Sequence, residues 1–118
     1  MDLLPASVFT EEATYYGTQA LGFGVPLDSR FLDPSSGCAP HASKTDWQLW
    51  MAAAVNDPTT ISTFIDSVYA FATTSSDRVP FSDHYDTQTG QQFAFQARPV
   101  QGGMFSLLAL SGKSIVAP

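Results

Sequence analysis

The sequence predicts a mainly α-helical fold with one short β-hairpin near residues 83–98, and three observations lead to this expectation. Apolar residues recur at helical spacing in four segments of the 118-residue chain. Apolar and polar residues alternate at "QFAFQA", residues 92–97, as in a half-buried strand. Glycine, proline and aspartate are concentrated between these segments, as in turns. The expected helices cover about residues 5–20, 44–55, 58–73 and 103–110.

The first expected helix, residues 5–20, has both a start signal and a stop signal. Ser7 or Thr10 can cap its first turn, and the two glutamates that follow favour the positive end of the helix dipole. Two glycines and Pro26 then prevent the helix from continuing. Its apolar residues fall on roughly one face, which is expected to be buried: Val8, Phe9, Ala13, Tyr16 and Ala20.

The second expected helix, residues 44–55, carries the first candidate site residues. Ser43 and Asp46 stand three residues apart before an apolar run, as in a capping box. A carboxylate at this position is kept ionised by the helix dipole, so Asp46 is either a simple cap or a group suited to binding a cation. Trp47 and Trp50, spaced three apart, are expected in the core, with stacking on a ligand as the other interpretation.

The third expected helix, residues 58–73, has the clearest pattern. Asp57 can cap it, and Pro58 occupies the first turn, where a missing N–H costs nothing. One apolar stripe follows: Ile61, Phe64, Ile65, Val68 and Phe71. The last expected helix, residues 103–110, is short and apolar.

Residues 22–42 are expected to form a long loop, because proline, serine, glycine and aspartate recur throughout them. Long ordered loops are often functional. Cys38 and His41 have a spacing that invites a metal hypothesis, but zinc needs three or four ligands, and only His84 and scattered carboxylates remain. We therefore expect no metal site and no cofactor, and we interpret Cys38 as an exposed loop cysteine.

Charge and length restrict the partners of the chain. The formal net charge is −6 with only five lysines and arginines, so nucleic acid and anionic membrane surfaces are not expected to bind. No apolar run approaches the roughly 20 residues needed to cross a bilayer. A hydrophobic content of 44% with only 14% charged residues suggests apolar surface that requires a partner. The length is that of one domain, or of part of one.

The segment "DHYDTQTGQQFAFQARP" allows two interpretations. In the first, Asp83 and Asp86 bind a ligand's ammonium group and Arg98 binds a carboxylate through two hydrogen bonds. In the second, Asp86 caps the turn, Gly90 takes a positive φ, and Arg98 pairs with Asp83 or Asp86. Both interpretations remain open on the sequence.

Several phrases together resemble the C-terminal end of fungal glutaminase A and its relatives. They are "GFGVPLDSR", "KTDWQLWMAA", "TFIDSVYAF", "RVPFSDHYDTQTG" and "FQARPVQGGMFSLLAL", in this order, from about Val8 to Leu110. The resemblance implies helical hairpins as in part of an (α/α) toroid, an extracellular location, and an enzyme that releases ammonia from L-glutamine. Three features depart from the family pattern: the insertion "FLDPSSGCAPHA", Met104 in place of a histidine, and Phe23 in place of a tyrosine.

The resemblance implies a piece of a larger amidohydrolase whose active site is incomplete in this chain, and no catalytic residue is assigned. The candidates for binding substrate are Asp28, Arg30, Asp46, Trp47, Asp83, Asp86 and Arg98. A stand-alone fungal binding module, lectin-like or immunomodulatory, is the alternative, with aromatic residues stacking on a glycan. A non-catalytic oligomerising domain is the third interpretation. Apolar residues spread around the first helix predict a homodimer: Leu3, Leu4, Phe9, Tyr15 and Tyr16.

Overall fold

The computed structural model describes residues 4–27, 41–74, 80–93 and 95–111, and these parts are mainly helical, as predicted. The α-helices are α1 (Ala6–Gln19), α2 (Thr45–Val55), α3 (Pro58–Thr74) and α4 (Ser106–Leu110). A 3-10 helix, η3 (Pro99–Phe105), leads directly into α4. The strands β1 (Ala42–Lys44) and β2 (His84–Asp86) form a small antiparallel sheet.

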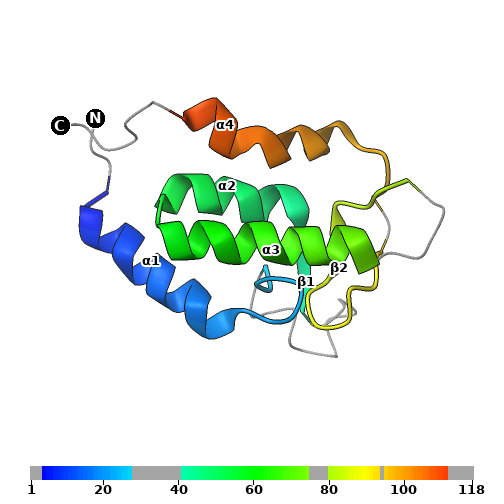
Figure 1. Cartoon of the computed structure of the whole chain (residues 1–118), viewed down its shortest axis with the longest axis horizontal. Coiled ribbons are helices and arrows are strands. Elements are labelled where there is room, and N and C mark those ends of the chain that lie inside the picture. Colours follow the sequence, from blue (N-terminus) through cyan, green and yellow to red (C-terminus); the bar gives the residue numbers. More distant parts are fainter. Residues whose placement is uncertain (1–3, 28–40, 75–79, 94, 112–118) are drawn as a thin grey trace.

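The helices α2 and α3 form a hairpin at the centre of the molecule (Figure 1). Asn56 turns the chain in the left-handed region at φ 53°, and its N–H donates to the carbonyl of Ala52. The carboxylate of Asp57 then accepts hydrogen bonds from the backbone N–H (2.8 Å) and hydroxyl (3.0 Å) of Thr60. The predicted Asp57 cap is therefore confirmed. The segment η3–α4 lies along α2, and α1 lies on the opposite side of the hairpin (Figure 1).

The core lies between α2 and α3 and continues beneath the segment that follows α1. Its buried residues are Val25, Leu49, Ala52, Phe64 and Val68, with Tyr16, Met51, Ile61 and Met104 packed against them. Of the predicted stripe on α3, Phe64, Val68 and Phe71 are buried, whereas Ile65 is exposed. The expectation that Trp47 and Trp50 lie in the core is wrong. The sides of α2 that pack closely carry small residues such as Ala52 and Ala53, and the two indoles stack on each other at the surface.

The strand β2 takes part in the predicted hairpin and also pairs with a segment that the sequence did not suggest. Its partner is β1, in the register Ala42↔Asp86 and Lys44↔His84. Residues 92–97 make only isolated bridges to the segment around β2. The predicted alternation fails because Phe95 and Ala97 take positive φ, which turns the chain out of a strand and leaves Phe95 exposed. The short β-hairpin is therefore present through the antiparallel bridges Ser82↔Gln96 and Tyr85↔Gln92, and the regular β1–β2 sheet begins inside the expected long loop.

The predicted caps of the first two helices are also wrong. Pro5 precedes α1, and no side chain caps that helix. The two glutamates lie beyond its first turn. Ser43 lies in β1, which runs directly into α2, so Lys44 takes the capping position without a side-chain hydrogen bond. The predicted inner face of α1 is half-buried, and none of the described residues of α1 is fully buried.

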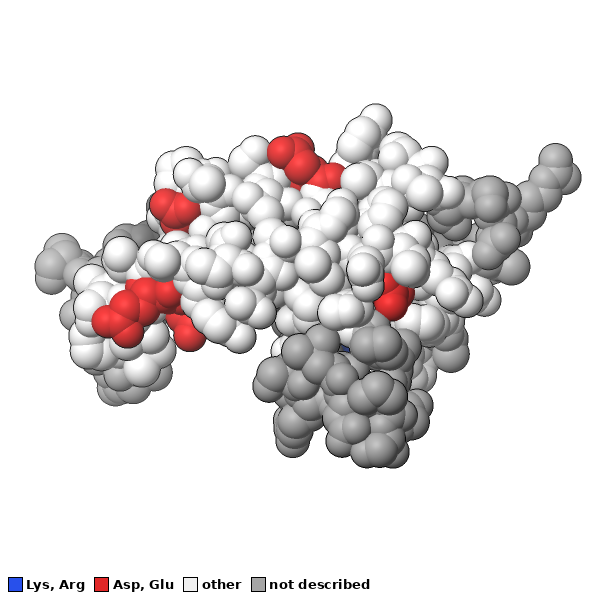
Figure 2. All heavy atoms as spheres, turned by 90° about the horizontal axis from the view of Figure 1, so that it is seen from below, with Lys and Arg blue, Asp and Glu red and all other residues white. Residues whose placement is uncertain are grey.

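Acidic side chains are spread over the surface in separate groups. Figure 2 shows several of them on one face, with almost no lysine or arginine between them. None of the helices in the described ranges is both long enough and apolar enough to pass through a bilayer.

A polar cluster at the N-terminal end of helix α2

Three segments bring charged side chains together where α2 begins. The backbone N–H of Thr45 donates to the carbonyl of Asp83 (3.0 Å), which fixes the first turn of α2 against the start of β2. The N–H of Asp83 in turn donates to the carbonyl of Phe95 (3.3 Å). These two backbone contacts place Asp46, Asp83 and Arg98, three of the predicted site residues, in one polar cluster.

Asp83 is the anionic centre of this cluster. Its carboxylate is fully buried and accepts two hydrogen bonds from Arg98, at 2.9 Å from Nε and 2.5 Å from Nη2. Lys44 Nζ lies 3.5 Å from the same carboxylate. Burial raises the pKa of Asp83, but the hydrogen bonds and charge of Arg98, together with Lys44, outweigh burial and lower it overall. The predicted structural pairing of Arg98 with Asp83 is confirmed.

Phe95 supports both cations from outside. The side chains of Lys44 and Arg98 lie over its ring, at 4.9 Å and 4.3 Å from the centroid. Its positive φ of 74° holds the ring in this position. His84 packs edge-on against the ring of Phe93 and also contacts Phe95. Burial, and then Lys44, lower the pKa of His84, so its imidazole is neutral at pH 7.

Asp46 differs from Asp83 although both carboxylates are fully buried. Neither oxygen of Asp46 has a hydrogen-bond partner in the described part of the chain. The expectation that Asp46 caps the helix is therefore wrong. Burial raises the pKa of Asp46, the nearby Asp83 raises it further, and its own backbone amide, Lys44 and Arg98 only partly oppose them. A buried carboxyl group without partners is uncommon and can bind or exchange a proton.

The 3-10 helix η3 covers Asp46. The hydroxyl of Thr45 donates to Gln101 Oε1 (3.3 Å), and the hydroxyl of Ser106 donates to the carbonyl of Leu49 (2.7 Å). Gly103 lies so close that an added Cβ would be 2.4 Å from Trp50 Nε1 and 2.9 Å from Asp46 Cβ. Only glycine allows η3 to pack directly on the first turns of α2.

Three members of this cluster were not among the predicted site residues: Lys44, Gln101 and Gly103. Lys44 stands two residues before Asp46, and Gly103 belongs to a Gly-Gly pair, so the sequence contained a signal for both. Gln101 carried none, because its role depends on how η3 folds back over α2.

The remaining predicted site residues do not join the cluster. Asp86 lies at the other end of β2, where its carboxylate accepts hydrogen bonds from the backbone N–H groups of Gln88 and Thr89, both at 2.8 Å. Gly90 follows at φ 73°, so the predicted turn cap is confirmed. Trp47 lines a separate hollow of about 230 Å³. Asp28 and Arg30, like Cys38, lie outside the described residues.

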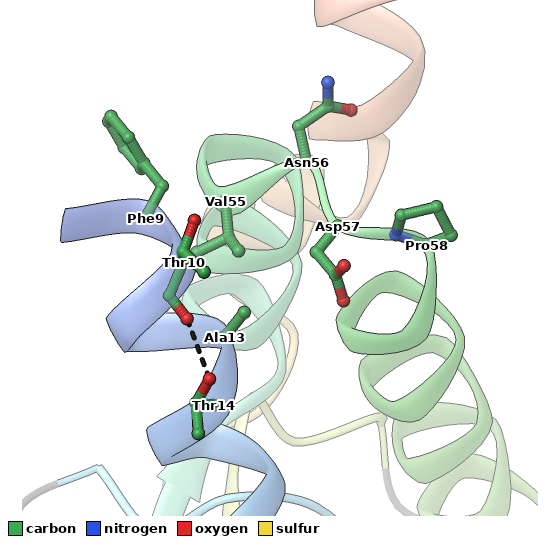
Figure 3. A pocket seen from close by; sticks show the side chains of 8 residues that line it. All are labelled: Phe9, Thr10, Ala13, Thr14, Val55, Asn56, Asp57 and Pro58. Carbon is green, nitrogen blue, oxygen red and sulfur yellow. Dashed lines mark hydrogen bonds between the residues drawn. The ribbon is translucent and has the colours of Figure 1, made fainter. Parts of the chain in front are cut away.

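A larger hollow of about 480 Å³ opens at the opposite end of α2, between α1 and the α2–α3 turn (Figure 3). Among the described residues that line it, the one carboxylate is Asp57, and the N–H and hydroxyl of Thr60 lower the pKa of this residue by hydrogen-bonding its ionised form. The carboxylate beside this hollow is therefore already hydrogen-bonded within the protein. Among the described residues, no three His, Cys, Asp or Glu side chains come together as a metal ion would require.

Comparisons with known proteins agree with the hairpin architecture. Residues 1–108 match the family model of the glutaminase A six helical-hairpin domain. The chain is 35% identical over 113 residues to glutaminase A of Aspergillus oryzae, which covers 93% of this chain and 15% of that protein. It is 31% identical over 110 residues to a probable glutaminase of Arthroderma benhamiae, covering 91% of this chain and 12% of that protein. The chain thus spans about one seventh of the first relative and less of the second. No solved structure matches.

Proposed function

We propose that this chain, which belongs to the glutaminase A six helical-hairpin family, supplies one wall of the substrate site of an amidohydrolase. The reaction is the hydrolysis of L-glutamine to L-glutamate and ammonia. Two relatives named as a glutaminase and a probable glutaminase support the reaction class. Because the chain spans only 15% and 12% of these relatives, we expect other hairpins to complete the site.

The observation that carries this proposal is the contrast between the two buried carboxylates of the cluster. Asp83 is neutralised by Arg98 and Lys44, so it fixes the geometry of the cluster. Asp46 has no hydrogen-bond partner in the part of the chain that the structure describes. A polar substrate that donates to Asp46 would remove the cost of burying this group without partners.

The charges of the cluster suit an amino acid ligand. The side chains of Lys44 and Arg98 are partly exposed, at 20% and 37%, whereas the carboxylates of Asp46 and Asp83 are buried. These two cations can bind the α-carboxylate of a free amino acid on the outer side of the cluster. Asp46 on the inner side is the acceptor for an N–H group.

A binding experiment with amino acids tests the proposal. L-Glutamine, D-glutamine and L-leucine are titrated into the purified chain and followed by two-dimensional NMR. We expect only L-glutamine to shift the resonances of Lys44, Asp46 and Arg98, with millimolar affinity, because part of the site is absent. We also expect ammonia release well below about 1 per second, the lower range of ordinary enzymes. Equal shifts with L-leucine, or shifts confined to other parts of the molecule, would contradict the proposal.

A glycan-binding module is the second candidate function, and one observation favours it. The indoles of Trp47 and Trp50 are 46% and 44% exposed, and their centroids stack 6.3 Å apart at 26°. Such a surface can stack on a sugar ring. A glycan array that gives one clear motif, lost in Trp47→Ala, would favour this function over the amidohydrolase.

We further propose an extracellular location, as the family resemblance implies, and a homodimer. Exposed apolar side chains just before α1, on α1 and on the η3–α4 segment support self-association, among them Leu4, Tyr15, Phe105 and Leu108. Light scattering at micromolar concentration should give twice the monomer mass of 12.7 kDa. A monomer with a cooperative melt would contradict the dimer.

A further inference from the structure

Two polar groups without partners lie beneath η3, and they are complementary. Within the described residues, the buried oxygens of Asp46 and the buried Nε2 of Gln101 make no hydrogen bond. The first group is an acceptor when ionised, and the second is a donor. An unpartnered buried acceptor and an unpartnered buried donor each cost free energy, so a ligand that satisfies both is favoured.

The two groups belong to one layer between α2 and η3. Gln101 Oε1 accepts a hydrogen bond from the hydroxyl of Thr45, the residue that precedes Asp46. Gly103, two residues after Gln101, lies directly against Asp46. The amide of Gln101 and the carboxyl of Asp46 therefore belong to the same buried contact layer at the first turn of α2.

We propose that Asp46 and Gln101 form a recognition pair for a primary carboxamide, the end of the L-glutamine side chain that reacts. This inference rests on the proposed function and assigns a task to two of its residues. A primary amide has N–H groups that donate to the Asp46 carboxylate and a carbonyl that accepts from Gln101 Nε2. No apolar side chain offers both.

The same pair distinguishes substrate from product. Hydrolysis replaces the amide nitrogen of glutamine by oxygen, so the product carries a carboxylate where the substrate donated to Asp46. The side-chain carboxylate of L-glutamate and the ionised carboxylate of Asp46 would repel each other, and the hydrogen bond from the substrate's N–H to Asp46 would be lost. We therefore expect L-glutamate to bind more weakly than L-glutamine at this site, which helps product release.

Access to the pair requires η3 to move. Asp46 is 0% exposed, so a ligand reaches it only when η3 separates from α2. The hydrogen bonds from Thr45 and Ser106 hold this cover in place. Gly102, next to the close contact at Gly103, has nothing within 4 Å of its added Cβ position and leaves open space beside the cover.

The pair is tested by NMR on the intact chain with four probes: L-glutamine, L-glutamate, L-norleucine and propionamide. We compare wild type with Asp46→Asn and Gln101→Met, and with Gln88→Met as a control on the exposed turn after β2. The readouts are the dissociation constant and the side-chain NH₂ resonances of Gln101. A purely structural role would leave these resonances unchanged when propionamide is added.

We expect L-glutamine and propionamide to shift the Gln101 side-chain resonances and L-norleucine to leave them in place. Gln101→Met should weaken L-glutamine binding by roughly tenfold, the effect of about 1.4 kcal/mol, while Gln88→Met changes nothing. If L-glutamine binds wild type but Asp46→Asn and Gln101→Met bind it equally well, the pair is overturned and the proposed function stands. If propionamide shifts Gln101 while L-glutamine does not bind, the pair stands and the proposed function is overturned. If neither ligand binds, both are overturned.

Discussion

The two ends of helix α2 present opposite arrangements. At its C-terminal end, the carboxylate of Asp57 is satisfied by Thr60, and a hollow of about 480 Å³ lies beside it. At its N-terminal end, Asp46 is buried without partners beneath η3. The C-terminal end therefore has a hollow beside a carboxylate that is already hydrogen-bonded. The N-terminal end has a buried carboxyl group without hydrogen-bond partners, covered by η3. We therefore identify the candidate site by its buried polar group without hydrogen-bond partners, and not by the volume of the hollow.

The same distinction separates the aspartates of the cluster region. Asp83 is balanced by two cations, and Asp86 by two backbone N–H groups. Both stabilise the local structure. Neither carboxylate oxygen of Asp46 has a hydrogen-bond partner among the described residues, which is why we assign it to the ligand.

The largest expected effect comes from Asp83→Asn. The substitution removes the carboxylate that Lys44 and Arg98 contact directly, and we expect a loss of about 2–3 kcal/mol in the free energy of unfolding, since breaking a buried pair is costly but Arg98 is partly exposed. The matched control is Asp86→Asn, because asparagine caps a turn nearly as well as aspartate. Urea denaturation of both variants at pH 7 measures the difference. Equal losses of stability in Asp83→Asn and Asp86→Asn would contradict the different roles that we assign to these two aspartates.

This loss should depend on pH in a defined direction. The pKa of Asp83 is lower in the folded chain than its ordinary value of 3.8, so the stabilisation is complete above 3.8. It disappears as the pH falls through the lowered folded value. Wild type and Asp83→Asn should therefore become equally stable in strong acid, and a gap that persists there would show that charge is not the cause.

Gly103→Ala should have the next largest effect. The added Cβ meets Trp50 and the Cβ of Asp46, and η3 must shift away from α2, at a cost of about 1–2 kcal/mol. Gly102→Ala is the matched control, since nothing lies within 4 Å of that position, and we expect a change within about 0.5 kcal/mol. Tryptophan fluorescence should report the shift in the first variant only. Similar melting temperatures for both variants would mean that η3 does not pack closely on the N-terminal end of α2.

The smallest effect is expected at the other end of the helix. Asp57→Ala removes the cap of α3 and should lower the melting temperature less than Gly103→Ala does, whereas Asp57→Asn keeps most of the cap. Neither variant should alter L-glutamine binding, because the hollow beside Asp57 has no role in our account. If Asp57→Ala folds normally but no longer binds L-glutamine, the site lies at the C-terminal end of α2 and our account is wrong.

Local signals in the sequence predicted much of the fold. Apolar periodicity identified the main helices, and the Asp57–Pro58 pair identified the start of α3. The pairing of β2 was not predictable in this way, because β1 lies some 40 residues away in a segment rich in loop residues. The strand-like alternation at residues 92–97 was overridden by positive φ at Phe95, whose ring is used by two cations.

The candidate site was only partly predictable. Asp46, Asp83 and Arg98 stood out by residue type and by their place in turns and caps. Their division of roles did not, because it depends on which carboxylate η3 covers and which one Arg98 reaches. The exposure of Trp47 and Trp50 was missed for a related reason: helical spacing reports a shared face, but not whether that face is covered.

The stability of Asp46→Asn between pH 3 and pH 8 tests the central claim most directly, with Asp83→Asn measured beside it. The pKa of Asp46 is raised in the folded chain, so its ionised form destabilises the fold above that pKa, and this penalty vanishes below the ordinary value of 3.8. We predict that Asp46→Asn is at least as stable as wild type at pH 7, that the two become equal below about pH 3.8, and that Asp83→Asn is clearly less stable at pH 7. If Asp46→Asn loses as much stability at pH 7 as Asp83→Asn does, Asp46 is a structural residue and the account is wrong.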